Sequence, residues 1–230
     1  MSDIEISVVI PAYFEANNLE LVLPRLTNTL KEMKIPYEVI IVDSMIPLDE
    51  TENICKKNNV HYVNRKNGNE YGFAFITGIQ IAKGKSIVIM DADGSHDPEK
   101  IKELYQFRNE YQIVIASRYL EKSSTEVSFY LTGMSLILNY IYKFVLGIDA
   151  NDISNSYRLY NGEMLRGVTL TSRNFDILQE VLYKFIRKYN AKIKEIPLQF
   201  HKRKSGKSKR NYLVFIPNYI KTLIKLRFFN

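Results

Sequence analysis

The sequence predicts a mixed α/β fold in which a mostly parallel β-sheet carries helices on both faces. Short apolar runs rich in Val and Ile alternate with amphipathic segments over residues 6–116, and the connections between them are short. The chain has 230 residues, of which 46% are hydrophobic, enough to bury a sizeable core. These observations together favour one domain built around a single sheet.

Each element of the first half follows from its local pattern. Five continuous apolar runs predict buried strands, namely residues 6–10, 37–42, 60–63, 87–90 and 113–116. Four segments between them predict helices, namely residues 17–33, 50–58, 71–83 and 98–107. Gly84 ends the third helix, and Pro98 lies in the first turn of the fourth, where proline is tolerated. Pro24 lies inside the first helix and is expected to kink it.

The second half of the chain is less regular. Residues 127–148 are mostly apolar, with Lys143 as the only charge. A spanning helix needs about 20 predominantly apolar residues, and because Ser, Thr, Asn and Gly interrupt this run, we expect a buried or interfacial helix instead. Three further elements are predicted, namely a helix over 175–189, a strand over 191–200 and a short helix over 217–227 that begins at Pro217.

Basic residues are concentrated at the C-terminal end. Residues 201–230 contain nine of the 32 Lys and Arg and no Asp or Glu, whereas the other 23 basic residues are matched by 25 acidic ones. The net charge of +7 therefore arises from this end. It predicts an anionic partner there, which is phosphate, anionic lipid or nucleic acid. We divide the chain into a domain over residues 1–210 and an amphipathic, basic segment over 211–230.

The sequence also gives an expectation for the cellular compartment. Cys55 is the only cysteine, so no disulfide forms within the chain, which suits a reducing compartment. The first apolar stretch, residues 6–11, is too short for a secretory signal and lacks a basic lead-in. We therefore expect a cytoplasmic protein.

Carboxylates follow the apolar run that ends at Met90. Asp91 and Asp93 come at alternate positions as the chain leaves this strand. In a parallel sheet, ligands bind at the carboxyl ends of the strands, and Mg²⁺ is commonly held there by one or two carboxylates together with substrate phosphates. The pair therefore suits a divalent cation with a nucleotide diphosphate. The alternative is a solvated turn that caps the following helix.

Longer motifs occur in a definite order. They are SVVIPAYFEANNL from residue 7, YEVIIVD ending at 43, DADGSHDPEKI from 91, IASRY from 115, DISNSYRLY from 152, and the stretch from FDILQEV at 175 to HKRKSGKSK at 209. Together they resemble the family 2 inverting glycosyltransferases, and the later motifs look like the dolichol- or polyprenyl-phosphate mannose synthase branch. The resemblance covers roughly residues 5–210. It implies a GT-A fold, a mostly parallel, Rossmann-like sheet flanked by helices.

The resemblance also implies an activity and roles for single residues. The activity is transfer of a hexosyl unit from GDP-mannose or a UDP-sugar to a dolichyl or undecaprenyl phosphate. Five residues match nucleotide-contacting positions: Pro11, Ala12, Tyr13 and Glu15 in the first loop, and Asp43, which reads the base. Six match phosphate or metal positions: Asp91 and Asp93 around the diphosphate and a Mg²⁺ or Mn²⁺ ion, Arg118 of the Ser-Arg pair, and Arg203, Ser208 and Lys209 of the R-x-x-G-x-S-K stretch. Asp93, Arg118 and Arg203 are the expected catalytic residues.

Two positions depart from the pattern of this family. The segment after Asp43 is bulkier than the small-residue turn that family members have, which bears on the identity of the base and the donor. Ser95 stands where the mannose synthases tend to have a glutamine that binds the metal. His96 is expected to support the turn rather than act on the substrate.

The chemistry of the acceptor distinguishes two enzymatic interpretations. A phosphomonoester is already anionic at neutral pH, because its second pKa is about 6, so it needs cations rather than a base. Four residues are candidates for this cationic lining, namely Arg118, Arg158, Arg203 and Lys209. A sugar-hydroxyl acceptor, as in capsule or cell-wall polysaccharide synthesis, needs a general base, for which the sequence offers Asp152 and Glu180.

Two further expectations concern the partners. A polyprenyl phosphate is a lipid, so we expect the basic, partly apolar end of the chain to contact an anionic membrane peripherally, at its cytoplasmic face. A non-enzymatic nucleic-acid-binding module is the third interpretation. The acidic excess of the first 200 residues and the Asp-x-Asp pair disfavour it.

Overall fold

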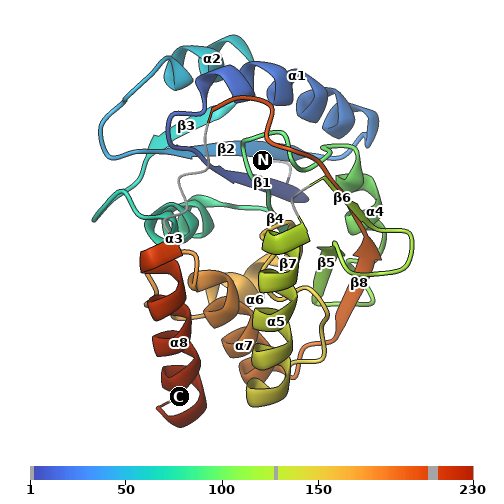
Figure 1. Cartoon of the computed structure of the whole chain (residues 1–230). Helices are drawn as coiled ribbons and strands as arrows, with labels where there is room; N and C mark the ends of the chain where they lie inside the picture. Colours follow the sequence, from blue (N-terminus) through green and yellow to red (C-terminus); the bar gives the residue numbers. More distant parts are fainter. Residues whose placement is uncertain (1–2, 127–128, 207–211, 230) are drawn as a thin grey trace.

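The structure is a computed structural model that describes residues 3–126, 129–206 and 212–229. Within these residues, a seven-stranded sheet has the order β3-β2-β1-β4-β7-β5-β8, and β6 pairs with β9 separately (Figure 1). The strands are β1 (Ile6–Pro11), β2 (Tyr37–Asp43), β3 (His61–Asn64), β4 (Ser86–Ile89), β5 (Ile113–Ser117), β6 (Ser124–Thr125), β7 (Arg158–Asn161), β8 (Ile193–Pro197) and β9 (Gln199–Phe200). The helices are α1 (Ala16–Glu32), α2 (Thr51–Lys57), α3 (Tyr71–Ile81), α4 (Lys100–Gln106), α5 (Phe129–Leu146), α6 (Gly162–Arg166), α7 (Ile177–Tyr189) and α8 (Tyr212–Phe228).

The sheet is mostly parallel, as predicted. β1 pairs in parallel with β2 and β4, and β5 pairs in parallel with β8. β7 is the exception, because it runs antiparallel to both β4 and β5 and separates them, with Arg158 opposite Ile89 on one side and Ile115 on the other. β7, β6 and the short helix α6 were not predicted from the sequence.

Helices cover both faces of the sheet, and alternate strand residues feed two separate cores. Val8 and Ile10 of β1 pack into the core under α1, α2 and α4. Val9, between them, points to the opposite face, where α3, α5, α6, α7 and α8 complete the second core. This two-sided burial explains why the strands read as continuous apolar runs.

Two predicted elements differ in detail from the structure. The strand expected over 191–200 is interrupted at Leu198 and forms β8 and β9, which belong to different sheets. The last helix starts five residues earlier than expected, so that Pro217 lies inside α8 rather than at its beginning. Pro24 lies inside α1, which is assigned as one continuous helix.

α5 and α8 contact each other and project together from the sheet (Figure 1). One face of α8 is docked, because Tyr219 and Leu226 are buried and the Thr222 hydroxyl donates to the Asp176 carboxylate at 2.7 Å. The Tyr142 hydroxyl of α5 donates to the Tyr219 carbonyl and joins the two helices. In the described parts of the chain, no helix combines the length and the apolar character that crossing a membrane requires.

Candidate active site

The carboxyl ends of the parallel strands meet at one edge of the sheet. β1 leads into Ala12, β2 ends at Asp43, β4 is followed shortly by Asp91, and β5 ends just before Arg118. Because β7 runs in the opposite direction, the segment that precedes it, residues 152–157, reaches the same edge. The structure therefore brings the expected strand-end residues to one edge and adds a segment that the sequence analysis did not place there.

The Asp-x-Asp turn is held by hydroxyl and backbone groups. The Ser156 hydroxyl donates to Asp91 Oδ1 at 2.8 Å. Asp93 Oδ1 accepts from the backbone N–H and the hydroxyl of Ser95, at 3.0 and 2.6 Å. Gly94 lies between Asp93 and Ser95 and has a φ of +77°, a left-handed conformation that favours glycine. Ser95 thus orients Asp93 through two hydrogen bonds.

The basic loop 201–206 lies across this turn. Arg203 Nη1 donates to both carboxylate oxygens of Glu15, at 2.9 and 3.0 Å, and its Nη2 lies 3.3 Å from Asp93 Oδ2. His201 Nε2 lies 2.9 Å from Asp97 Oδ2, and hydrogen bonds to the carboxylates of Asp97 and Glu126 raise the pKa of His201. Arg203 is therefore beside the Asp-x-Asp pair, where the sequence analysis expected a phosphate-binding cation.

The residues that were expected to contact the nucleotide lie in the same region, and most of them are buried. Pro11, Ala12, Glu15 and Asp43 are buried, whereas Tyr13 is half-buried. Asp43 Oδ2 accepts from the Tyr62 hydroxyl at 3.1 Å, and Asp43 Oδ1 is buried with no hydrogen-bond partner in the described structure. Burial raises the pKa of Asp43. An unpaired buried acceptor of this kind suits a donor group on a ligand such as a nucleobase.

Arg65 is a residue of this region that the sequence analysis missed. Its buried guanidinium donates to the carbonyls of Ala12, Asp43 and Asn69, and so ties the ends of β1 and β2 to the segment before α3. Burial lowers the pKa of Arg65, while the charge of Asp43 opposes that shift. The available signal was an arginine placed two residues after the predicted strand over 60–63, at the edge where ligands bind.

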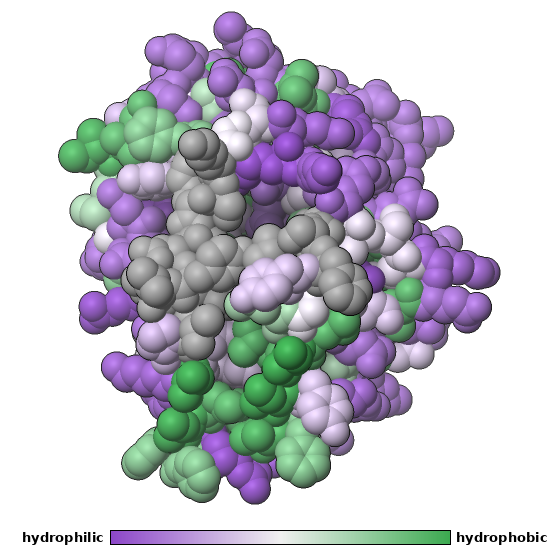
Figure 2. Space-filling model, viewed as in Figure 1, coloured by the Kyte–Doolittle hydropathy of each residue, from purple (hydrophilic) through white to green (hydrophobic). Residues whose placement is uncertain are grey.

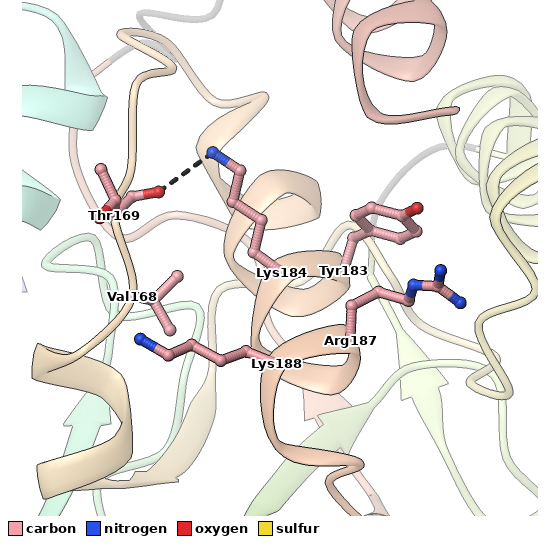
Figure 3. Close-up of a pocket in the computed structure, with 6 residues that line it drawn as sticks. All are labelled: Val168, Thr169, Tyr183, Lys184, Arg187 and Lys188. Atoms are coloured by element: carbon pink, nitrogen blue, oxygen red, sulfur yellow. Dashed lines mark hydrogen bonds between the residues drawn. The ribbon is translucent and has the colours of Figure 1, made fainter. Parts of the chain in front are cut away.

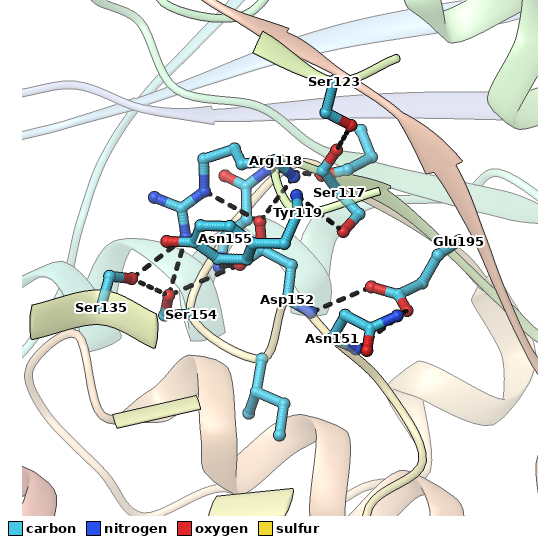
Figure 4. A network of polar contacts seen from close by, with 12 residues as sticks. Ser117, Arg118, Tyr119, Ser123, Ser135, Asn151, Asp152, Ser154, Asn155 and Glu195 are labelled. Atoms are coloured by element: carbon cyan, nitrogen blue, oxygen red, sulfur yellow. Dashed lines mark hydrogen bonds and ion pairs between the residues drawn. The ribbon is translucent and has the colours of Figure 1, made fainter. Parts of the chain in front are cut away.

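Arg118 is paired rather than free. Its Nε and Nη2 donate to the two carboxylate oxygens of Asp152, at 2.8 and 2.7 Å, and Nη2 also donates to Ser154 (Figure 4). Burial alone would raise the pKa of Asp152, but the charge and hydrogen bonds of Arg118 lower it. Glu195 accepts from the backbone N–H of Asp152 and completes the network. Asp152, which the sequence analysis offered as a base, is thus an ionised partner of Arg118.

Contrary to expectation, Arg158 does not lie at the edge of the sheet where the strand-end residues meet. Its side chain is 0% exposed in the second core. Its Nη1 donates to the Leu178 carbonyl at 2.9 Å, and its Nη2 donates to the Ile153 carbonyl at 2.6 Å. Side chains alternate along a strand, and position 158 of β7 faces the side that α7 covers. Arg158 therefore joins β7 to α7 instead of facing a phosphate.

Glu180, the other candidate base, has a structural role. It is buried and accepts from the backbone N–H groups of Thr171 and Ser172, at 3.0 and 2.7 Å, and it pairs with Lys184 at 2.7 Å. Lys184 also lines a pocket of about 400 Å³ beside α7, where it donates to the Thr169 carbonyl (Figure 3). None of the expected site residues lines this pocket.

The Asp-x-Asp pair fits a divalent cation only together with a ligand. Asp91 and Asp93 supply two carboxylates, and no group of three His, Cys, Asp or Glu side chains able to hold a metal occurs among the described residues. Two carboxylates completed by phosphate oxygens are a usual Mg²⁺ environment. The guanidinium of Arg203 against Asp93 shows that the site attracts positive charge. Ser208 and Lys209 lie outside the described residues.

Several known proteins are similar to this chain in sequence. Residues 7–169 match the glycosyl transferase family 2 model. The chain is 32% identical over 212 residues to the dolichol-phosphate mannosyltransferase of Pyrococcus furiosus, a match that covers 89% of this chain and 59% of that protein. It is 28% identical over 215 residues to the undecaprenyl-phosphate mannosyltransferase of Micrococcus luteus, covering 87% of this chain and 85% of the relative. The chain thus spans about three fifths of the Pyrococcus protein.

Solved structures share the fold. Glucosyl-3-phosphoglycerate synthase from Mycobacterium tuberculosis, in complex with Mn²⁺, UDP and phosphoglyceric acid, is similar with a TM-score of 0.76 at 16% identity, covering 98% of this chain and 79% of that one. The seven-stranded, mostly parallel sheet flanked by helices is accordingly the GT-A glycosyltransferase fold, as expected. The family model covers well over half of the described residues, including the Asp-x-Asp turn and Arg118. This chain therefore belongs to glycosyl transferase family 2.

Proposed function

We propose that this chain is a metal-dependent, inverting glycosyltransferase. It moves a hexosyl unit from GDP-mannose or a UDP-sugar to a polyprenyl phosphate, at the cytoplasmic face of a membrane. Relatives named as polyprenyl-phosphate mannosyltransferases support the acceptor class. The Mn²⁺ in structures of the same fold supports a divalent cation, Mg²⁺ or Mn²⁺.

The observation that carries the proposal is that both candidate bases are already engaged in hydrogen bonds and ion pairs. Asp152 is bonded to Arg118, and Glu180 is bonded to backbone N–H groups and Lys184, so neither is free to take a proton from a sugar hydroxyl. A phosphate acceptor needs no such base, because it arrives ionised. It needs a cation near the donor diphosphate, and Arg203 lies beside Asp93. The geometry therefore favours a phosphate over a hydroxyl acceptor.

The chain itself acts mainly by positioning and neutralising charge. A divalent cation held by Asp91 and Asp93 supplies charge for the leaving diphosphate when it is bound. Arg203 exchanges its contacts with Glu15 and Asp93 for phosphate oxygens, so that its charge faces the place where two anions meet. Because Arg203 pairs with Glu15 and Asp93, we expect loop 201–206 to shift when the donor enters.

A panel assay tests the proposal. GDP-mannose, UDP-glucose and UDP-GlcNAc are each combined with a short polyprenyl phosphate and Mn²⁺ or Mg²⁺, and lipid-linked sugar is measured. A parallel series offers an oligosaccharide as the hydroxyl acceptor, and EDTA replaces the metal in both series. We expect lipid-linked sugar from one donor only, abolished by EDTA. Transfer to the oligosaccharide alone, or undiminished transfer in EDTA, would contradict the acceptor or the metal.

An exposed apolar face on α5 and α8 supports contact with a membrane. Ten of the fifteen large hydrophobic side chains that are exposed in the described structure belong to these helices or follow α8 directly: Tyr130, Leu136, Ile137, Tyr140, Ile141, Phe144, Ile220, Ile224, Phe228 and Phe229. Figure 2 shows an apolar area in the lower half of the view, where α5 and α8 lie in Figure 1. Lys143, Lys221 and Arg227 lie on the same two helices. Apolar side chains with a cationic border are typical of peripheral binding to anionic lipid.

We expect the protein to sediment with liposomes in proportion to their anionic lipid content and to be released by salt, because surface charges are screened at high ionic strength. The double variant Ile137→Asp/Phe144→Asp is expected to lose most of this binding, since it places two charges in the apolar face, where Phe144 is 80% exposed. The measurement is co-sedimentation at several salt concentrations.

The matched control is Leu21→Asp. Leu21 is 58% exposed on α1, on the opposite side of the sheet, so the same chemical change falls outside the apolar face. We expect this variant to bind liposomes as the wild type does. Equal losses in both variants, or binding to neutral liposomes that salt does not alter, would argue against this surface.

A further inference from the structure

His96 is buried between the Asp-x-Asp turn and the segment 152–157. It is 1% exposed. Its Nδ1 lies 3.1 Å from the backbone nitrogen of Asp91, and its Nε2 lies 3.2 Å from Asn155 Oδ1. The imidazole thus connects the residue that opens the turn to a segment about sixty residues further along the chain.

The hydrogen bonds assign the tautomer of His96. A backbone N–H can only donate, so Nδ1 must accept from Asp91 and carries no proton. In the neutral imidazole the proton then lies on Nε2, which donates to Asn155 Oδ1. The Asn155 amide is itself oriented, because its Nδ2 donates to the Ala116 carbonyl at 2.6 Å. Each group therefore donates to the next in one direction, from the backbone N–H of Asp91 through His96 and Asn155 to the Ala116 carbonyl of β5.

The ring of His96 is also fixed by its packing. It stacks on Tyr157 with a centroid distance of 4.6 Å and an interplanar angle of 14°, and the edge of Phe200 contacts it at 5.5 Å. A ring held on two sides cannot rotate to exchange its hydrogen bonds. His96 is thus a rigid connection rather than a mobile acid or base.

Three successive residues of the segment contact the turn. Asn155 bonds His96, the Ser156 hydroxyl donates to Asp91 Oδ1 at 2.8 Å, and the Tyr157 hydroxyl donates to the Asp97 carbonyl at 2.8 Å. The backbone N–H of Asp91 and one oxygen of its carboxylate are thereby fixed from the same segment. Asp91 Oδ1 is engaged, and this orientation leaves Oδ2 to serve a cation.

We propose that His96 and Asn155 form a positioning pair that sets the geometry of Asp91 for binding a divalent cation together with a nucleotide diphosphate. This inference rests on the proposed function, because it assigns Asp91 to that ligand. Partners that orient a metal ligand without touching the metal typically change metal affinity 10- to 100-fold when they are removed. A histidine that only filled the core would affect stability and leave that affinity unchanged.

The test measures binding rather than transfer. Calorimetric titrations with GDP and with UDP, each in the presence of Mn²⁺, are compared for wild type, His96→Phe and Asn155→Leu. His96→Phe keeps an aromatic ring in the stack but removes the acceptor for the Asp91 N–H. Asn155→Leu keeps a similar volume but removes the acceptor for Nε2. We expect each variant to bind the Mn²⁺–nucleotide at least about tenfold more weakly than wild type.

Two further variants separate positioning from stability. Tyr157→Phe removes one buried hydrogen bond from the same segment without touching Asp91, so its melting temperature is expected to fall while its affinity stays within about twofold of wild type. His96→Asn offers an amide oxygen near the former Nδ1 position and is expected to recover part of the affinity that His96→Phe loses.

The outcomes distinguish this inference from the proposed function. If the wild type binds neither nucleotide in the presence of Mn²⁺, both the positioning pair and the proposed function are overturned. Wild type that binds, with His96→Phe or Asn155→Leu binding equally well, would overturn the positioning pair and leave the proposed function standing. Equal losses in Tyr157→Phe would likewise reduce His96 to a packing role. If His96→Phe does not fold, Asn155→Leu and His96→Asn decide the question.

Discussion

Arg203→Ala is expected to lower kcat on the order of a hundredfold, as removal of one charge-stabilising donor typically does. The guanidinium lies between Glu15 and Asp93, at the place where we propose that donor and acceptor phosphates meet. Its side chain is partly exposed, whereas its partner Glu15 is buried, so the variant also loses an ion pair that contributes to stability. The measurement is lipid-linked sugar formed per unit time at saturating donor, with the melting temperature recorded alongside.

Arg203→Lys is expected to restore only part of that rate. The planar guanidinium contacts two carboxylates through different nitrogens, whereas a lysine ammonium is a single point charge that cannot reproduce the fork. Lys202→Ala is the matched control, because Lys202 is the neighbouring basic residue, its side chain is exposed, and its backbone N–H rather than its side chain donates to Glu126. A rate equal to wild type in Arg203→Ala would remove Arg203 from the phosphate site.

Asp93→Asn is expected to remove most turnover while leaving the fold intact. Asparagine is similar in size and retains an oxygen that accepts from Ser95, so the turn is preserved. It lacks the negative charge that a divalent cation needs, and the loss should be at least the 10- to 100-fold that follows from disturbing even an indirect metal contact. We expect the Mn²⁺ concentration for half-maximal rate to rise steeply, and the melting temperature to change little.

The control for Asp93→Asn is the same change at another aspartate. Asp149 is 98% exposed and makes only a surface ion pair with Lys143 among the described contacts, so Asp149→Asn should have wild-type kinetics. Activity that persists in EDTA, or an Asp93→Asn variant with an unchanged response to Mn²⁺, would separate this turn from metal binding.

The strands were largely predictable because they are buried on both faces. β1, β2, β4 and β5 read as continuous Val and Ile runs, and their order along the chain was sufficient to place them in one parallel sheet. β7 was not predictable in this way. It has only four residues, begins with an arginine and ends with an asparagine, and its place depends on antiparallel pairing with two strands that lie far from it in sequence.

The candidate site was predictable where it depends on single strand ends. Asp43, Asp91 and Asp93 follow apolar runs, and the rule that ligands bind at the carboxyl edge of a parallel sheet places them together. The expectation for Arg158 was wrong because the face of β7 that it occupies depends on a strand that was not recognised. The contacts of Asn155 and Ser156 with the turn were missed for the same reason, since spacing along the chain does not reveal them.

The position of β7 has a consequence for how the chain acquires its structure during synthesis. β4 and β5 contact each other through β7 alone, so each keeps an open edge until residues 158–161 have left the ribosome. Residues emerge at about 5–20 per second, so one edge of β4 and both edges of β5 stay unpaired for several seconds after β5 is made. Such edges invite pairing with other chains. The sheet is thus completed late in synthesis. A chain that ends before β7 is expected to aggregate rather than to form a smaller enzyme.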